Sequence, residues 1–101
     1  MNIIDLTETE RRLIGACLRA AADGPFFPDW EFSTLFGLTR EEVRGAAAAW
    51  PPEGKVDAVM ETAVRNALNN LTGYPHRRDD EFQKWTGVGR AEMVALLEKW
   101  R

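Results

Sequence analysis

Residues 31–50 read EFSTLFGLTREEVRGAAAAW, and residues 81–100 read EFQKWTGVGRAEMVALLEKW. Placed at an offset of 50 residues, the two stretches share six identical residues, and apolar residues of one also match apolar residues of the other. A repeat of this length is typical of a duplicated supersecondary unit. The identical pairs are Glu31/Glu81, Phe32/Phe82, Gly37/Gly87, Arg40/Arg90, Glu42/Glu92 and Trp50/Trp100.

The spacing of apolar residues predicts three helices in each half, in the order long, short and medium, and no strand. The first long helix should span residues 8–22, because Thr7 and Glu10 have the spacing of a capping box. Gly24 and Pro25 should end this helix, with Gly24 in the left-handed conformation.

The second long helix has the clearest periodicity in the chain, over residues 56–71. Asp57 is its expected N-cap and Gly73 its expected C-terminal stop. The four remaining helices follow from their caps and terminal glycines. Short helices are expected at Asp29–Phe36 and Asp79–Thr86, ended by Gly37 and Gly87, and medium helices at Arg40–Trp50, after a Thr39/Glu42 capping box, and Arg90–Trp100.

These elements predict an all-α fold of six helices, built as two tandem three-helix repeats at residues 6–50 and 56–101. Residues 51–55 form the linker. Each repeat has only about 45 residues, too few for a stable core of its own. The repeats should therefore pack about a pseudo-twofold axis into one domain.

Composition favours an ordinary globular protein. The chain has 101 residues, of which 45% are hydrophobic and 29% charged, with a formal net charge of −3. It contains no apolar run of the length that a membrane-spanning helix needs and no signal-peptide pattern, so we expect a cytoplasmic, bacterial-type protein with no membrane partner. The absence of a basic excess disfavours a nucleic-acid partner.

Two short helices around a glycine turn resemble a helix-turn-helix unit, here over residues 32–46. Phe32, Phe36, Leu38, Val43 and Ala46 fall at its core positions, Ser33 at its small position and Gly37 in its turn. The resemblance implies that the helix starting at Thr39 could enter the major groove of DNA, with Arg40, Arg44 and Arg90 as contacts. The chain is also similar to small uncharacterised bacterial all-helical proteins, which implies no function.

An aromatic stretch over residues 24–30 is the first candidate for binding a partner. Of its three rings we expect two in the core and one at the rim of an interaction site. Phe26 is the expected rim residue because its counterpart at offset 50 is the polar His76, and Trp30 is the second candidate.

A polar stretch over residues 69–80, with the helical turn before it, is the second candidate. Asparagine is unfavourable inside a helix, so three in five positions need an explanation. Two interpretations stay open, namely hydrogen bonds that tether the following loop and contacts with a partner. The candidate residues are Asn66, Asn69, Asn70, Tyr74, His76, Arg77 and Arg78.

Catalysis and metal binding are disfavoured. The nucleophiles and bases that an enzyme would use, Ser33, Cys17 and His76, fall in separate predicted elements. A metal site would have to use His76 with the acidic residues 79–81, which a helix N-terminus explains more simply. We expect no cofactor.

The sequence therefore favours a non-catalytic interaction or regulatory module that binds another protein through loop 24–30 or loop 69–80. A DNA-binding protein is the alternative. A homodimer is a further alternative, because Ala46–Ala49 give a smooth helix surface on which a second copy could pack.

Overall fold

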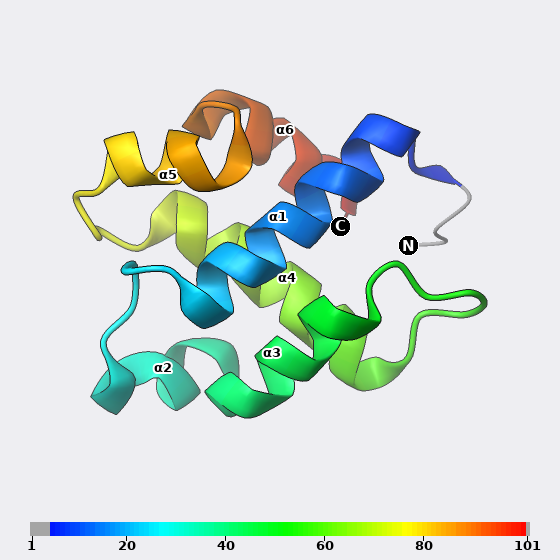
Figure 1. The fold of residues 1–101 in the computed structure, drawn as a ribbon, viewed down its shortest axis with the longest axis horizontal. Helices are drawn as coiled ribbons and strands as arrows, with labels where there is room; N and C mark the ends of the chain where they lie inside the picture. Colours follow the sequence, from blue (N-terminus) through cyan, green and yellow to red (C-terminus); the bar gives the residue numbers. More distant parts are fainter. Residues whose placement is uncertain (1–4, 101) are drawn as a thin grey trace.

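Six α-helices make up the fold, which a computed structural model describes over residues 5–100 (Figure 1). No strand occurs among these residues, so the prediction of an all-helical domain is confirmed. The predicted helix boundaries agree with the observed ones to within about two residues. The helices are α1 (Glu8–Asp23), α2 (Asp29–Phe36), α3 (Arg40–Ala49), α4 (Ala58–Gly73), α5 (Asp79–Thr86) and α6 (Arg90–Trp100).

The predicted caps set the starts of three helices. The Glu10 N–H donates to the Thr7 hydroxyl at 3.0 Å, and the Thr7 N–H donates to the Glu10 carboxylate at 2.8 Å. Thr39 and Glu42 form the same reciprocal pair at the start of α3. The Asp57 carboxylate accepts from the Met60 N–H at 2.8 Å and begins α4. Each contact satisfies backbone groups that have no partner inside the helix.

The glycines after the short helices end them as predicted, in the left-handed conformation, with φ of 67° at Gly37 and 78° at Gly87. The same expectation for Gly24 was wrong, because its φ of −82° is extended. Gly24 is needed there for space instead. A Cβ atom at this position would lie 2.4 Å from the Ala20 carbonyl oxygen.

The long helices α1 and α4 contact each other at the centre, with α2 and α3 on one side and α5 and α6 on the other (Figure 1). The short helices cross over between the halves, since α2 packs on α4 and α5 packs on α1. Each half therefore covers the long helix of the other. The Cα radius of gyration, 12.3 Å, is that of one compact domain of this length.

The core lies between the apolar faces of α1 and α4, where Ile14, Leu18, Val64 and Leu68 are fully buried. Cys17 is buried as predicted, and its Sγ atom lies 3.2 Å from Sδ of Met93. Burial raises the pKa of the Cys17 thiol to about 12, so the thiol stays protonated and unreactive. Aromatic rings from α2 and α5 extend the core outward.

Two pairs of residues that match at offset 50 contact each other across the domain. The Phe26 and His76 ring centroids lie 4.9 Å apart, and those of Trp50 and Trp100 lie 6.3 Å apart. The two tryptophans differ in their indole N–H groups. Trp50 is half-buried and donates to the Arg11 carbonyl at 2.8 Å, whereas Trp100 is buried and its N–H has no partner among residues 5–100.

One expectation drawn from the helix-turn-helix resemblance was wrong. Ser33 was expected to be small because two helices approach closely there, but its side chain is exposed. The apolar residues Phe32 and Phe36 form the buried side of α2, and Ser33 lies on the side that faces solvent. Its counterpart Gln83 is exposed as well, so this position is under no packing constraint in either half.

Candidate functional site

The two candidate stretches, which the sequence offered as alternatives, lie at the same end of the fold (Figure 1). The loop between α1 and α2 and the loop between α4 and α5 are joined by ring contacts. Phe26 packs edge-on against His76, and the Phe27 and Tyr74 ring centroids lie 5.5 Å apart. The Tyr74 hydroxyl also donates to the Glu31 carboxylate at 2.7 Å. These contacts fix the two loops relative to each other.

Phe26 is a core residue, so its expected place at a rim was wrong. It is only 2% exposed and packs against the rings of both His76 and Phe82. Phe27 is also buried, which leaves Trp30 as the exposed member of the stretch, at 82%. Two of the three rings thus lie in the core as expected. The inference failed at Phe26 because its polar counterpart packs directly against it.

His76 is held by two hydrogen bonds to the backbone. The Arg78 N–H donates to Nδ1 at 3.0 Å, so Nδ1 acts as the acceptor. Nε2 then carries the hydrogen and donates it to the Leu71 carbonyl at 3.1 Å. His76 therefore stabilises the exit from α4, and both of its ring nitrogens are already used.

Tyr74 links the second loop to α2. The hydrogen bond to Glu31 raises the pKa of Tyr74 above its ordinary value, since the ionised phenol would repel the carboxylate and lose the bond. Partial removal from water acts in the same direction.

Asn66 and Asn70 serve as tethers, but the segment that they hold is α2 and not the loop after α4. The Asn66 amide donates to the Phe36 carbonyl at 2.6 Å, and the Asn70 amide donates to the Leu35 carbonyl at 3.0 Å. Both carbonyls lie at the C-terminus of α2, where helix carbonyls need outside partners. Asn69 points elsewhere. Its side chain is exposed and makes no hydrogen bond within residues 5–100.

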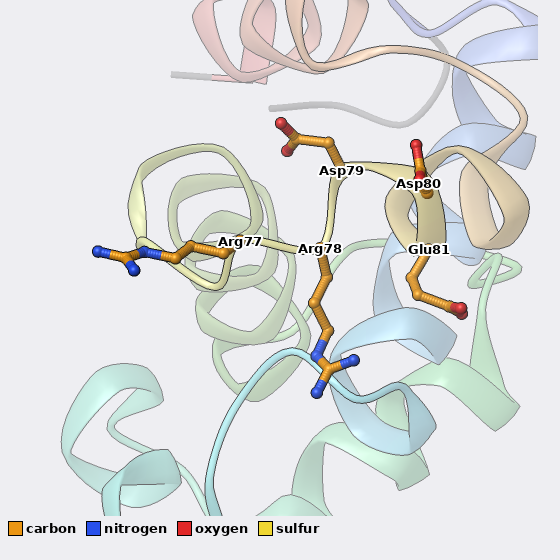
Figure 2. Close-up of a pocket in the computed structure, with 5 residues that line it drawn as sticks. All are labelled: Arg77, Arg78, Asp79, Asp80 and Glu81. Atoms are coloured by element: carbon orange, nitrogen blue, oxygen red, sulfur yellow. The ribbon is translucent and has the colours of Figure 1, made fainter.

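Arg77 and Arg78 are exposed and line an open depression of about 580 Å³ with Asp79, Asp80 and Glu81 (Figure 2). The five side chains diverge in Figure 2 and do not converge on one point. Neither of the two arginines forms an ion pair with another residue of the described chain. Arg77 has a φ of 59°, an uncommon conformation for a residue other than glycine.

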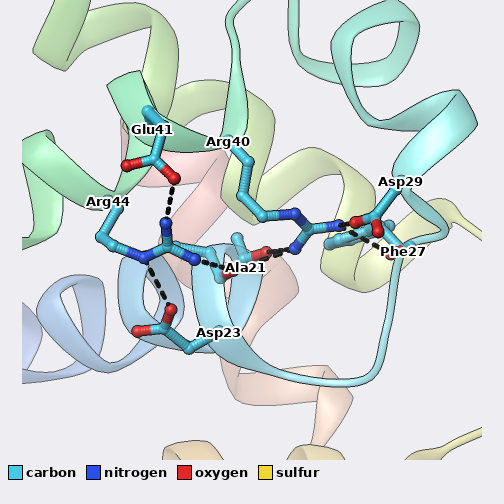
Figure 3. A network of polar contacts seen from close by, with 8 residues as sticks. Ala21, Asp23, Phe27, Asp29, Arg40, Glu41 and Arg44 are labelled. Carbon is cyan, nitrogen blue, oxygen red and sulfur yellow. Dashed lines mark hydrogen bonds and ion pairs between the residues drawn. The ribbon is translucent and has the colours of Figure 1, made fainter.

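The arginines of the DNA-binding alternative hold the fold together (Figure 3). Arg40 donates to the Ala22 carbonyl at the end of α1 and to the Phe27 carbonyl, both at 2.9 Å. Its guanidinium pairs with Asp29 at 2.9 Å and lies 4.3 Å from the centre of the Phe32 ring. We refer to this set of contacts as the Arg40 clamp.

The second half has an equivalent Arg90 clamp. Arg90 donates to the Thr72 carbonyl at 3.1 Å and pairs with Asp79 at 2.8 Å. Thr72 and Asp79 stand 50 residues after Ala22 and Asp29. The sequence shows the matching arginines, but their role in holding the fold together was not predicted from it. The matching aspartates were the available signal, since an Arg–Asp pair retained in both halves suggests a structural contact.

Arg44 is also engaged within the fold (Figure 3). Its Nε donates to the Asp23 carboxylate at 2.9 Å, and its Nη1 pairs with Glu41. The hydrogen bond to Asp23, followed by the one to Glu41, raises the pKa of Arg44. A DNA-binding role for Arg40 and Arg44 would require them to give up contacts with the C-terminus of α1.

A shallow groove of about 220 Å³ lies between α3 and α4, lined by Gly45, Ala46, Ala49 and Val59 among others. Ala49 and Val59 are exposed there. This is the surface on which the sequence suggested contact with a second copy.

Other kinds of site find less support in the geometry. Within residues 5–100, no three His, Cys, Asp or Glu side chains are grouped so that they could share a metal ion. No helix in the same range has both the length and the apolar character to span a bilayer. In comparisons with known proteins, no family model, curated protein or solved structure matches this chain.

Proposed function

We propose that this protein is a non-catalytic interaction module that binds a partner protein through the end where the two loops meet. We refer to the exposed candidates there, Trp30, Asn69, Arg77 and Arg78, as the loop surface. The observation that carries the proposal is the exposure of Trp30, at 82%. Every other aromatic side chain within residues 5–100 is buried or half-buried.

An exposed tryptophan offers a large gain on binding. A buried tryptophan side chain removes about 150–250 Å² from water, which at about 25 cal/mol per Å² is several kcal/mol. Single exposed apolar residues are common on protein surfaces and need no function. What favours a binding role for Trp30 is its place beside Glu31, which Tyr74 ties to the second loop.

The arginines of the second loop add the other residue type that is common in binding hot spots. Arg77 and Arg78 keep their guanidinium donors unpaired within the described chain, whereas Arg40, Arg44 and Arg90 do not. The contacts among Phe26, Phe27, Tyr74 and His76 hold this end in one shape. Such preorganisation lowers the entropy lost on binding.

The internal repeat belongs to the same proposal. We infer that residues 6–50 and 56–101 arose by duplication and pack about a pseudo-twofold axis. The observed helices begin 50 residues apart in all three pairs, and each half has one arginine clamp. The contacts Phe26–His76 and Trp50–Trp100 support the axis, because only residues close to a twofold axis can touch their own counterparts.

A capture experiment with matched variants tests the proposed function. Tagged wild-type protein, Trp30→Ser and Val94→Ser are incubated with a lysate of the source organism, with and without nuclease. Val94 is the control because it is exposed and apolar (41%) but lies on α6. We expect one protein to be retained by wild type and Val94→Ser in both nuclease conditions, and to be lost with Trp30→Ser.

Two outcomes would contradict the proposal. Equal retention by Trp30→Ser would remove the loop surface as the binding site. If the retained material is DNA and is lost on nuclease treatment, the helix-turn-helix alternative is favoured. The affinity for DNA should then be lowered by Arg40→Ala and should fall steeply with added salt.

A further inference from the structure

A second surface, away from the loops, runs along α1 beside the start of the linker. It is a groove of about 280 Å³ between α1 and the pair Trp50–Pro51. Its α1 side is lined by Arg11, Arg12, Gly15 and Arg19, and Glu8 lies at one end. The function proposed above makes no use of this groove.

Gly15 lets the Trp50 ring and the Arg19 side chain lie close against the backbone of α1. A Cβ atom at this position would lie 3.0 Å from Cδ1 of Trp50 and 3.3 Å from Nη1 of Arg19. The indole ring and the guanidinium therefore meet over the bare backbone of α1. A glycine in the middle of a helix is unfavourable, so the close approach of Trp50 explains its presence.

Apart from Glu8, all the charged residues that line the groove are arginines. Arg12 and Arg19 are exposed, and neither forms an ion pair with another residue of the 5–100 range. They are seven residues apart, which places both on the same face of α1, and the Arg19 guanidinium reaches back toward Arg12 as far as Gly15. An anionic ligand could therefore reach both guanidinium groups at once.

The floor between the arginines is apolar. The N–H of Trp50 is already bonded to the Arg11 carbonyl, so the ring offers carbon surface to a ligand. Pro51 continues this surface. A ligand that matches the groove has more than one anionic group and an apolar group that can lie on the Trp50 ring.

We propose that this groove binds an extended acidic segment of a partner protein, with an apolar residue between its carboxylates. The carboxylates of such a segment complement Arg12 and Arg19, neither of which forms an ion pair with another residue of the 5–100 range. A nucleic-acid strand fits less well. The net charge of the chain is −3, and Glu8 closes one end of the groove with a further negative charge.

The second half of the chain does not carry the groove's side chains at the matching positions, so the repeated fold does not require them. The counterparts of Arg12, Gly15 and Arg19 are Thr62, Arg65 and Asn69. Arg65 carries a long side chain where Gly15 has none, and it pairs with Glu61 at 3.4 Å. This set of side chains is thus particular to α1.

A titration with defined peptides tests the proposal. The probe is a fluorescein-labelled octapeptide of Asp and Glu with one central Leu, and binding is followed by anisotropy at low salt. We expect Arg12→Gln with Arg19→Gln to weaken binding about tenfold or more. The matched control, Lys55→Gln with Arg65→Gln, removes the same charge elsewhere and should change the affinity less than about twofold.

Further probes separate the parts of the site. Replacing the central Leu of the peptide by Ser should weaken binding to wild type about threefold or more, because the contact with Trp50 and Pro51 is lost. The four substituted side chains are exposed or half-buried, so urea unfolding should show both double variants to be as stable as wild type.

Three results would overturn this proposal. They are no binding of the acidic peptide up to about 1 mM, equal binding to the Arg12/Arg19 variant, and tighter binding of a single-stranded oligothymidine than of the peptide. Because Trp30→Ser leaves the groove intact, it should bind the peptide like wild type. A failure of the loop surface is therefore distinguishable from a failure of the groove.

Discussion

The two loops at the same end of the molecule occupy matching places in the two halves but differ in what they carry. At corresponding positions the first has Phe26 and Phe27, both buried, and the second has His76 and Arg77, half-buried and exposed. The clamps of Arg40 and Arg90 hold both loops from outside. Loop geometry therefore depends on the clamps, and the residues within a loop can diverge without loss of the fold.

Among matched substitutions in the two halves, those in the aromatic core should have the largest effect on the free energy of unfolding. Phe32 stacks on Phe36 at 4.3 Å, whereas its counterpart Phe82 has the buried Thr86 in place of that partner. We expect Phe32→Ala and Phe82→Ala each to lower the free energy of unfolding by about 3–5 kcal/mol. Phe32→Ala should cost about 1 kcal/mol more, since it loses a stack at 4.3 Å, whereas the ring contacts of Phe82 with His76 and Phe26 lie at 6.3 and 6.4 Å.

Urea unfolding followed by circular dichroism measures both values. If Phe32→Ala is too unstable to analyse, the milder Phe32→Leu and Phe82→Leu pair gives the same comparison. An equal loss in the two halves would mean that the close Phe32–Phe36 stack contributes no more than the longer ring contacts of Phe82.

The Arg40 clamp should stabilise the fold more than the Arg90 clamp, because its arginine is less exposed to water. The Arg40 side chain is 21% exposed and that of Arg90 is 42%. We expect Arg40→Ala to cost about 2–3 kcal/mol and Arg90→Ala about 1 kcal/mol, because bonds to charged groups contribute more when water is excluded. Arg40→Lys should recover little, since an ammonium cannot reach both the Ala22 and the Phe27 carbonyl. Unchanged stability in Arg40→Ala would show that Arg40 is free for another role.

The asparagines of α4 offer an internal control. Asn66→Ala and Asn70→Ala should each lower the free energy of unfolding by about 1 kcal/mol, because a carbonyl of α2 loses its partner. Asn69→Ala should be neutral or slightly stabilising, since alanine is the better helix former. Equal effects at all three positions in thermal unfolding would contradict the role of tether.

The smallest effect concerns pH. The pKa of Tyr74 is raised by Glu31, so the stabilisation from this contact is complete below the ordinary tyrosine pKa of about 10 and is lost as the pH rises through the higher folded value. Tyr74 is the only tyrosine in the chain, so absorbance at alkaline pH reports it alone. Glu31→Gln should lower the titration midpoint. An unchanged midpoint would mean that the contact is absent in solution.

Local signals explain why the helices could be predicted. The capping residues Thr7, Thr39 and Asp57, with Gly37 and Gly87, act on neighbours within four residues. Their effect is therefore visible in the sequence itself.

The site was harder to predict because its contacts are distant in sequence. Asn70 bonds to a carbonyl 35 residues away, and the side chain of Phe26 is buried by a residue 50 positions later. For Phe26, comparison of the two halves led to a wrong prediction. Phe26 was assigned to the surface because His76 is polar, but two counterparts that touch each other share one environment.

The central claim is that the candidate residues named from the sequence form two groups. Some make contacts that stabilise the fold, and the others are exposed and available to bind a partner protein. The affinity of Trp30→Ser for the captured partner, measured beside its free energy of unfolding, tests this claim most directly. We predict an affinity lower by about thirtyfold with stability unchanged to within about 0.5 kcal/mol. An unchanged affinity, or a loss of stability large enough to explain the lost binding, would contradict it.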